Sequence, residues 1–402
     1  MTRTDPTGLE RRLGLGVADD RELARTILEA TIGANYATPS RIDYPNSEHP
    51  ALSLHFGKRR ALVAIEAGVA LTVDLAAQIE GSVTTKLLAP AKPSVFRTAL
   101  FAPWPTVGYW RYADKFVIRP APEQAPRPVT IVGDHPLVLE VMHDGAVDQG
   151  LQQLRGLKES RRIGRLLSLF IPGLKLPNPS SRHLWVTPID RDAPAEVRSV
   201  FAQEHYCIPG FSAMADELSD QGDLPAISLS RTFSLTVGVG QVLEIQRHTE
   251  ALLDTFFALP EAKQRRLLRA AYWLHHAQAE WSVSRSAYYQ ALVQAVEVLI
   301  DTPPNQAKCP ACDRTIGVGP TALFRKFLDE YAPSAGEDDE AARKVLYKTR
   351  SDITHGLRLL YDDEEDDFGW NNPEPIYDAM LVQRAHWVCR MAVMGWLGAH
   401  NE

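Results

Sequence analysis

The chain changes character near residue 240, and this change limits the folds that it can adopt. From there to the C-terminus, apolar residues recur at helical spacing, and prolines separate the periodic segments. The pattern predicts helices over residues 241–259, 261–280, 284–300, 320–331, 337–361 and 373–400. We therefore expect residues 241–402 to form an all-α domain, a bundle of packed helices.

The first 240 residues carry a different pattern. Nine prolines interrupt residues 90–136, and proline breaks helix interiors but is tolerated in loops and edge strands. One helix is predicted over residues 19–30, and strands over 52–56, 130–132, 137–142 and 183–186. The predicted fold class is therefore α+β, with a mixed α/β region over residues 1–240 before the helical bundle.

Composition restricts the function classes. The net charge of −7 argues against a general nucleic-acid coat, so any nucleic-acid contact needs a local basic patch. The apolar run 61–79 is interrupted by Glu66 and Asp74, which predicts a buried core segment and no membrane partner. The N-terminus lacks an apolar signal segment, and four cysteines are too few for a disulfide framework. We expect a cytoplasmic protein.

The segment with the clearest chemical content is the predicted helix 337–361. Leu346, Ile353, Leu357 and Leu360 form an apolar stripe, and Arg350 falls inside it, roughly 40° from Leu346. An arginine on a buried face needs a partner, because an unpaired buried charge is costly. His355 lies five residues further on, about 140° around a straight helix. Three explanations stay open: a helix distorted near Gly356, a site completed by groups from elsewhere, or a structural arginine with a surface or interface histidine.

The segment Leu346-Tyr347-Lys348-Thr349-Arg350-Ser351-Asp352-Ile353-Thr354-His355-Gly356 resembles the Arg-x4–6-His motif of the HEPN superfamily, in particular its Apea-like branch. The tyrosine upstream and the glycine after the histidine are part of the resemblance. The segment from Tyr289 to Leu299, an aliphatic helix with one embedded glutamate, is similar to a second helix of that branch. The resemblance covers roughly residues 283–400.

The resemblance implies an antiparallel helical bundle that dimerises through the motif helices. Active members are metal-independent endoribonucleases, which implies a catalytic Arg350 and His355, RNA as partner, and no cofactor needed for catalysis. His355 would act as general acid or base, and Arg350 would stabilise transition-state charge. Tyr347 and Asp352 belong to the same motif. Many active members carry Asn, Asp or His directly after the arginine, whereas this chain has Ser351.

Glu297 is the predicted partner of Arg350. It stands among apolar neighbours inside the predicted helix 284–300, where a lone carboxylate is disfavoured. The alternative is that Glu297 reaches solvent at the edge of the helix.

Three further groups have weaker signals. Cys309 and Cys312 form one CxxC pair, which is half of a structural zinc site, a redox pair, or two ordinary thiols. Arg161, Arg162 and Arg165 belong to a basic cluster that contacts the phosphate backbone of a nucleic acid, lies on a membrane surface, or forms a solvated helix face. The acidic run 362–367 is a solvated loop, a gate, or a contact for a basic partner.

These observations favour an RNA-cleaving or RNA-binding effector, a layout that the resemblance connects with bacterial stress or antiviral defence. Two alternatives remain: a non-catalytic HEPN-like dimerisation and interaction module, and a zinc-supported ligand-binding protein. The first 240 residues give no substrate or trigger.

Overall fold

The computed structural model is of mixed α and β type, as the sequence predicted. It describes residues 20–30, 36–38, 41–44, 51–56, 62–68, 70–125, 127–128, 135–171, 173–176, 183–186, 200–203, 208, 210–230, 241–281, 283–301, 307–308, 315–316, 319–334, 336–364 and 374–400.

The chain divides into two compact units. One comprises Met1–Arg97, Val141–Glu159 and Ser212–Leu218, and the other comprises Thr98–Glu140, Ser160–Phe211 and Ser219–Glu402. The boundary predicted at residue 240 therefore lies inside the second unit. Contacts between a strand segment and a helix join residues on the two sides of position 240 into one unit. Trp110 Nε1 donates to Glu250 at 3.1 Å, and Tyr112 Oη donates to Asp254 at 2.6 Å.

The first unit is built on an antiparallel sheet. Its strands are β1 (Tyr36–Thr38), β2 (Arg41–Tyr44), β3 (Leu52–Phe56) and β4 (Leu62–Ala67), paired in that order. Helix α2 (Asp20–Ala30) corresponds to the helix predicted over residues 19–30. Helix α3 (Val73–Ser82) was not predicted, and the π-helical turn η2 (Val83–Leu87) continues it.

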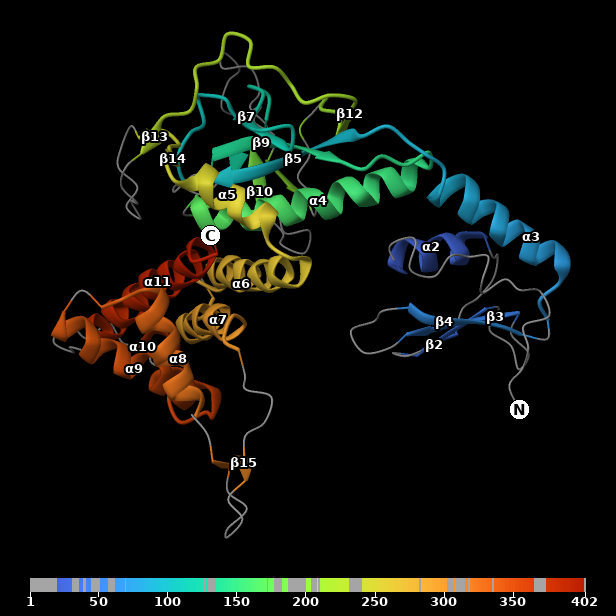
Figure 1. The fold of residues 1–402 in the computed structure, drawn as a ribbon. Helices are drawn as coiled ribbons and strands as arrows, with labels where there is room; N and C mark the ends of the chain where they lie inside the picture. Colours follow the sequence, from blue (N-terminus) through green and yellow to red (C-terminus); the bar gives the residue numbers. More distant parts are fainter. Residues whose placement is uncertain are drawn as a thin grey trace. The chain divides into compact units, whose positions relative to one another are not determined.

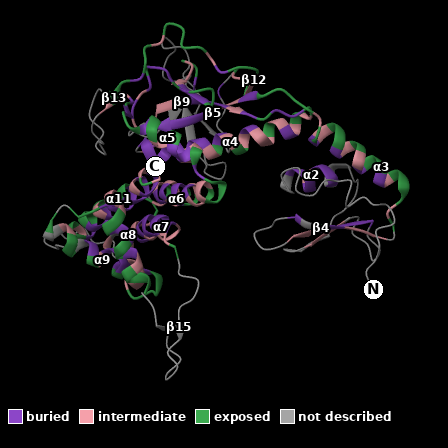
Figure 2. Ribbon diagram, in the orientation of Figure 1, coloured by how far each residue is buried: buried purple, intermediate pink, exposed green. Residues whose placement is uncertain are grey.

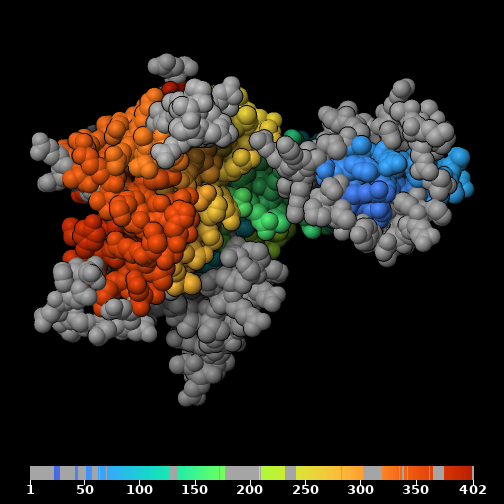
Figure 3. All heavy atoms as spheres, turned by 90° about the horizontal axis from the view of Figure 1, so that it is seen from below, coloured from blue at the N-terminus to red at the C-terminus, as the bar shows by residue number. Residues whose placement is uncertain are grey.

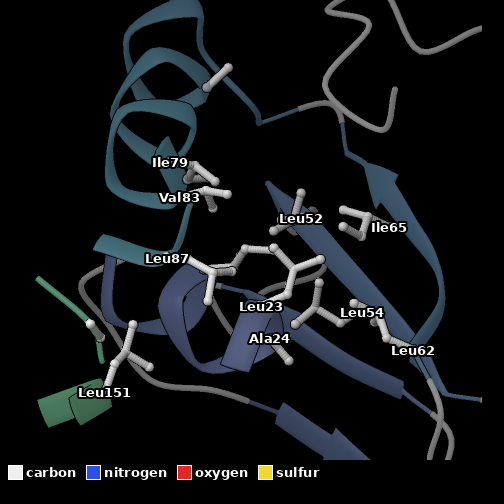
Figure 4. Packing of buried hydrophobic residues seen from close by; sticks show 13 residues of the cluster. Leu23, Ala24, Leu52, Leu54, Leu62, Ile65, Ile79, Val83, Leu87 and Leu151 are labelled. Atoms are coloured by element: carbon white, nitrogen blue, oxygen red, sulfur yellow. The ribbon is translucent and has the colours of Figure 1, made fainter. Parts of the chain in front are cut away.

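The core of this unit lies between the sheet and its helices. Leu23 and Ile27 from α2 meet Leu54 and Ile65 from the strands, and Ile79 of α3 joins them, all fully buried (Figure 4). The described part of the apolar run 61–79 is thus strand β4 followed by the first part of α3, which contributes Ala76 and Ile79 to the core. Among the helices in the described ranges, none has the length and apolar character needed to cross a membrane.

A five-stranded sheet has the order β12-β5-β9-β7-β6. Its strands are β12 (Met214–Ala215), β5 (Ser94–Ala102), β9 (His135–His143), β7 (Phe116–Pro120) and β6 (Trp110–Tyr112). Both β5 and β9 run from one unit into the other, as does helix α4 (Gln149–Phe170).

Small sheets complete the β structure. β8 (Arg127–Pro128), β10 (His183–Val186) and β11 (Val200–Gln203) form one, β13 (Leu229–Ser230) and β14 (Ile245–Gln246) another, and β15 (Ala307–Lys308) and β16 (Thr315–Ile316) a third. The predicted strands 52–56, 137–142 and 183–186 are present as β3, part of β9, and β10. The predicted strand 130–132 lies outside the described residues.

The remaining helices group together in the second unit (Figure 1). They are α5 (Thr249–Ala258), α6 (Glu261–Glu280), α7 (Arg285–Glu297), α8 (Pro320–Tyr331), α9 (Glu337–Thr354), α10 (Tyr361–Glu364) and α11 (Glu374–Gly398). Helix α7 is central: it packs on α6, α9 and α11, and most of its side chains are buried (Figure 2).

Two predicted helices are shorter in the structure by seven residues or more at one end. The helix predicted over 241–259 begins only at Thr249, because Ile245 and Gln246 pair with Leu229 and Ser230 as strands. The helix predicted over 337–361 ends at Thr354, because Gly356 adopts a left-handed conformation with φ of +67°.

A buried arginine ties α11 to the end of α4. Arg390 is 1% exposed, and its Nη2 donates to the carbonyl of Ser168 at 2.7 Å and to that of Leu169 at 2.5 Å. The last carbonyls of a helix lack partners within the helix and attract a cation. Arg390 therefore caps α4, and all three residues lie in the second unit.

Candidate functional site

Arg350 and Glu297 meet where α7 and α9 pack together. Arg350 Nη2 lies 2.9 Å from Glu297 Oε2, and the side chains are 22% and 21% exposed, respectively. Glu297 is the last residue of α7, so its carboxylate lies at the helix edge and is partly open to solvent. The predicted ion pair is present. One face of the guanidinium is held while part of it reaches solvent.

Tyr347 completes this group from the preceding turn of α9. The Arg350 Cζ atom lies 5.8 Å from the centre of the Tyr347 ring, which also packs on Phe324 of α8 at 5.2 Å. Burial raises the pKa of Tyr347, and the charge of Glu297 and a hydrogen bond to it raise that pKa further. The phenol is therefore a neutral donor, and Glu297 accepts from both Tyr347 and Arg350.

The register between α7 and α9 is fixed by a buried hydrogen bond. Tyr289 is fully buried, and its hydroxyl donates to the carbonyl of Leu346 at 2.8 Å. Burial raises the pKa of Tyr289 well above its ordinary value, so the group remains a donor. This contact places Glu297, two turns further along α7, opposite Arg350.

The C-terminus of α9 is closed by a glycine cap. The Gly356 amide donates to the Ile353 carbonyl at 3.1 Å, and the Leu357 amide donates to the Asp352 carbonyl at 2.9 Å. This pair of bonds with a left-handed glycine is the Schellman motif. The glycine of the sequence motif is thus the residue that ends the helix directly after the histidine.

His355 occupies the C-cap position, with φ of −90° and ψ of 5°, and it is exposed. His355 follows the last helical residue, but its amide still donates to the Ser351 carbonyl at 3.0 Å. The angle of about 140° from Arg350 expected for a straight helix therefore still applies approximately. Leu357, predicted on the buried stripe, is 76% exposed because the chain has left the helix. Leu346, Ile353 and Leu360 are buried as predicted.

Asp352, two residues after Arg350 and about 200° around the helix, is engaged elsewhere. Its Oδ2 atom lies 2.5 Å from Lys348 Nζ, an ion pair between residues four apart on α9. The structure thus brings Arg350, Glu297 and Tyr347 together and places Asp352 with Lys348.

Two carboxylates hold the segment that follows Gly356. One belongs to the acidic run and binds the start of α7, and the other belongs to α11. Asp363 accepts from the backbone amides of Arg285 at 2.9 Å and Ser286 at 2.6 Å, and from the Ser284 hydroxyl at 2.9 Å. Burial alone would raise the pKa of Asp363, but these hydrogen bonds outweigh it and lower the pKa. At least this residue of the acidic run is a helix cap for α7 and not a solvated charge.

Asp378 of α11 holds the same segment from the other side. Its Oδ2 atom accepts from the Tyr361 amide at 3.0 Å, and its Oδ1 atom pairs with Arg358. The Leu360 amide donates to Ser286 Oγ at 2.8 Å. His355 therefore stands at the start of a segment that is anchored to two helices.

The basic cluster on α4 contacts α5 and α6. Arg162 donates to Gln264 at 2.7 Å and lies over the rings of Phe256 and Phe257, at 5.4 Å and 5.7 Å. Arg165 lies over the ring of Tyr272, whereas Arg161 is exposed. Arg162 therefore packs between helices, Arg165 is half-buried against α6, and Arg161 remains at the surface.

Metal ligation is not visible in the described part of the chain. There, no group of three or more His, Cys, Asp or Glu side chains is placed to hold a metal ion. Cys309 and Cys312 lie outside the described residues, so the zinc prediction stays a prediction. Cys389 is buried in α11, and burial raises the pKa of its thiol to about 12.

Sequence reasoning missed the residues that anchor the site, namely Asp363, Asp378 and Ser286. The signal for Ser286 was weak, because the helix start is already marked by Ser284, whose hydroxyl accepts from Ala287 at 3.0 Å. Asp363 is one of six consecutive acidic residues, and nothing in such a run singles out one member.

Compared with models of protein families, with curated proteins and with solved structures, the chain matches none of them.

Proposed function

We propose that the second unit cleaves RNA without a metal ion, with His355 and Arg350 as catalytic residues. The observation that carries the proposal is the pairing of two differently held groups. Arg350 is fixed by Glu297 yet partly open to solvent, and the glycine cap presents an exposed imidazole five residues further on.

The chemistry suits these groups. The 2′-hydroxyl of a nucleotide gives its proton to an imidazole and attacks the adjacent phosphorus, and the bond from phosphorus to the 5′-oxygen breaks. An imidazolium returns a proton to that 5′-oxygen, which leaves as a hydroxyl, while a 2′,3′-cyclic phosphate remains. Arg350 stabilises the extra charge on the phosphoryl oxygens. Glu297 and Tyr347 are positioning residues that hold the guanidinium.

A second copy of the chain supplies what one copy lacks. The reaction uses a base and an acid, and each chain contributes one histidine of the motif. A two-fold dimer brings two imidazoles to one cleft. Leu357 and Leu359 follow His355 in the chain, and Ile376, Tyr377 and Met380 lie on α11, whose Asp378 pairs with Arg358. Each of these five apolar side chains is between 43% and 76% exposed. Contiguous exposed apolar surface is typical of an interaction site.

The cleavage assay uses structured total RNA in EDTA with the full chain, His355→Ala, Arg350→Ala and the charge control Arg325→Gln, an exposed arginine of α8. We expect cleavage by the wild type and the control, and its loss in the other two. Cleavage that needs a divalent metal, or that persists in His355→Ala, contradicts the proposal.

The same exposed apolar side chains favour a second candidate, a non-catalytic dimerisation and interaction module. In that case Arg350 and Glu297 only hold α9 on α7. Light scattering separates the two candidates when read with the assay: a dimer that Leu357→Asp dissociates, together with no cleavage under any condition, supports the module. A wild-type monomer at micromolar concentration contradicts both dimer proposals.

A further inference from the structure

Aromatic and basic side chains lie side by side where α4 passes α6 in the second unit. The Arg165 Cζ atom lies 5.1 Å from the centre of the Tyr272 ring. The ring of Tyr272 is nearly parallel to that of His276, with centres 5.8 Å apart and an interplanar angle of 6°. We name Arg161, Arg165, Arg269, Tyr272 and His276 the arginine–tyrosine patch. In Figure 3 the gold atoms of α6 lie against the green atoms of α4.

The patch is accessible and mostly basic. Tyr272 is 39% exposed, Arg161 and Arg269 are exposed, and Arg269 and Tyr272 are three residues apart on one side of α6. The described carboxylate nearest to His276 is Glu280, whose Oε1 atom lies 3.5 Å from the His276 Nε2 atom. The chain as a whole has a net charge of −7, whereas this group of arginines is positively charged.

The pKa shifts of nearby groups agree with this concentration of positive charge. Burial lowers the pKa of Arg165, and the charge of Arg161 lowers it further. Burial and the charge of Arg165 lower the pKa of His275, the neighbour of the patch on α6, to about 4. Like charges held together raise each other's energy, and a bound anion relieves that repulsion.

We propose that the arginine–tyrosine patch binds single-stranded RNA, with phosphates on its arginines and a base on the Tyr272 ring. Basic side chains interleaved with aromatic rings are the recurring solution for single strands, because phosphates need charge and every base has a flat face. The patch fits a lipid surface less well, because its rings are flanked by cations and it has no apolar face to insert among lipids. This inference rests on the proposed RNA function and assigns substrate holding to a surface apart from Arg350 and His355.

The test measures binding separately from cleavage. Fluorescence anisotropy follows a labelled oligouridine with the full-length His355→Ala chain in EDTA, at several salt concentrations. Tyr272→Leu removes the ring and is expected to weaken binding about 5- to 100-fold, whereas Tyr272→Phe keeps it. Arg161→Gln and Arg269→Gln each reduce the slope of log K against log salt by about 0.7. Both arginines are exposed, so their loss leaves the core intact. Arg325→Gln is the matched control.

Each outcome decides. Unchanged affinity in Tyr272→Leu with unchanged salt slopes, an equal loss in Arg325→Gln, or no binding of oligouridine overturns the proposal. Binding to phosphatidylserine vesicles in place of RNA overturns it in favour of a lipid surface. Failure of the wild type to cleave RNA overturns the proposed nuclease and leaves this binding measurement standing.

Discussion

Replacement of Gly356 by alanine tests the cap that presents His355. Its φ of +67° is unfavourable for any residue with a Cβ atom, and an added Cβ meets nothing within 4 Å. The cost is therefore the backbone term alone, about 1–2 kcal/mol for a left-handed residue, partly offset by about 0.4–1 kcal/mol from the stiffer unfolded chain. We expect a net loss of about 1 kcal/mol.

Urea unfolding followed by circular dichroism measures this change. Gly222 is a matched control in the same unit, with φ of +55° and open space around it, so Gly222→Ala should lose similar stability without affecting cleavage. Gly81, in helix α3, also has open space, and Gly81→Ala should stabilise its unit by about 0.5–1 kcal/mol. A Gly356→Ala chain as stable as the wild type refutes the assigned role of the cap.

Three further predictions concern the groups around the site. Glu297→Gln should cost about 1–3 kcal/mol of stability and lower kcat more than it raises KM, because Arg350 loses its charged partner; equal kinetics in the variant contradict this. Asp363→Ala should cost about 0.5–2 kcal/mol in urea unfolding, since α7 loses a cap, whereas Asp363→Asn should lose only part of this, because its one amide oxygen replaces one of the two accepting oxygens. Finally, the pKa values of His275 and His386 are lowered to about 4 from 6.5, mainly by burial. The unfolded chain therefore binds more protons than the folded chain between these values, so stability falls as the pH drops below 6.5, by roughly 1 kcal/mol per histidine at pH 5.5. His386→Gln should remove its share, and a pH-independent unfolding free energy between pH 7.5 and 5.5 contradicts the assignment.

Local patterns predicted the helices well where the ends carry their own signals. The predicted helices 261–280 and 320–331 match α6 and α8 to the residue, since prolines stand at their starts. The helix predicted over 241–259 began late because a strand pairing with Leu229 competes for the same residues. Such a pairing depends on tertiary context, which periodicity does not contain.

At the candidate site, too, local sequence predicted some contacts and not others. The pairing of Arg350 with Glu297 followed from the cost of a buried charge, a rule that applies to one residue at a time. The C-cap position of His355 did not follow, because a glycine after a helix pattern either continues or ends it, and the Schellman bonds that decide this involve the backbone. Asp363 and Asp378 anchor the segment after Gly356 through contacts between residues far apart in the sequence. Local sequence patterns do not predict such contacts.

The most direct test of the central claim is the identity of the new RNA end produced by the full chain in EDTA. A defined oligoribonucleotide and its counterpart with a single 2′-deoxy sugar at the cleaved position are incubated with wild type and with His355→Ala, and the ends are read by mass spectrometry. Catalysis by His355 and Arg350 predicts a 2′,3′-cyclic phosphate, an uncut 2′-deoxy position, and no product from the folded variant. Cleavage at the 2′-deoxy position, a 3′-hydroxyl end, or equal product from His355→Ala would contradict the account.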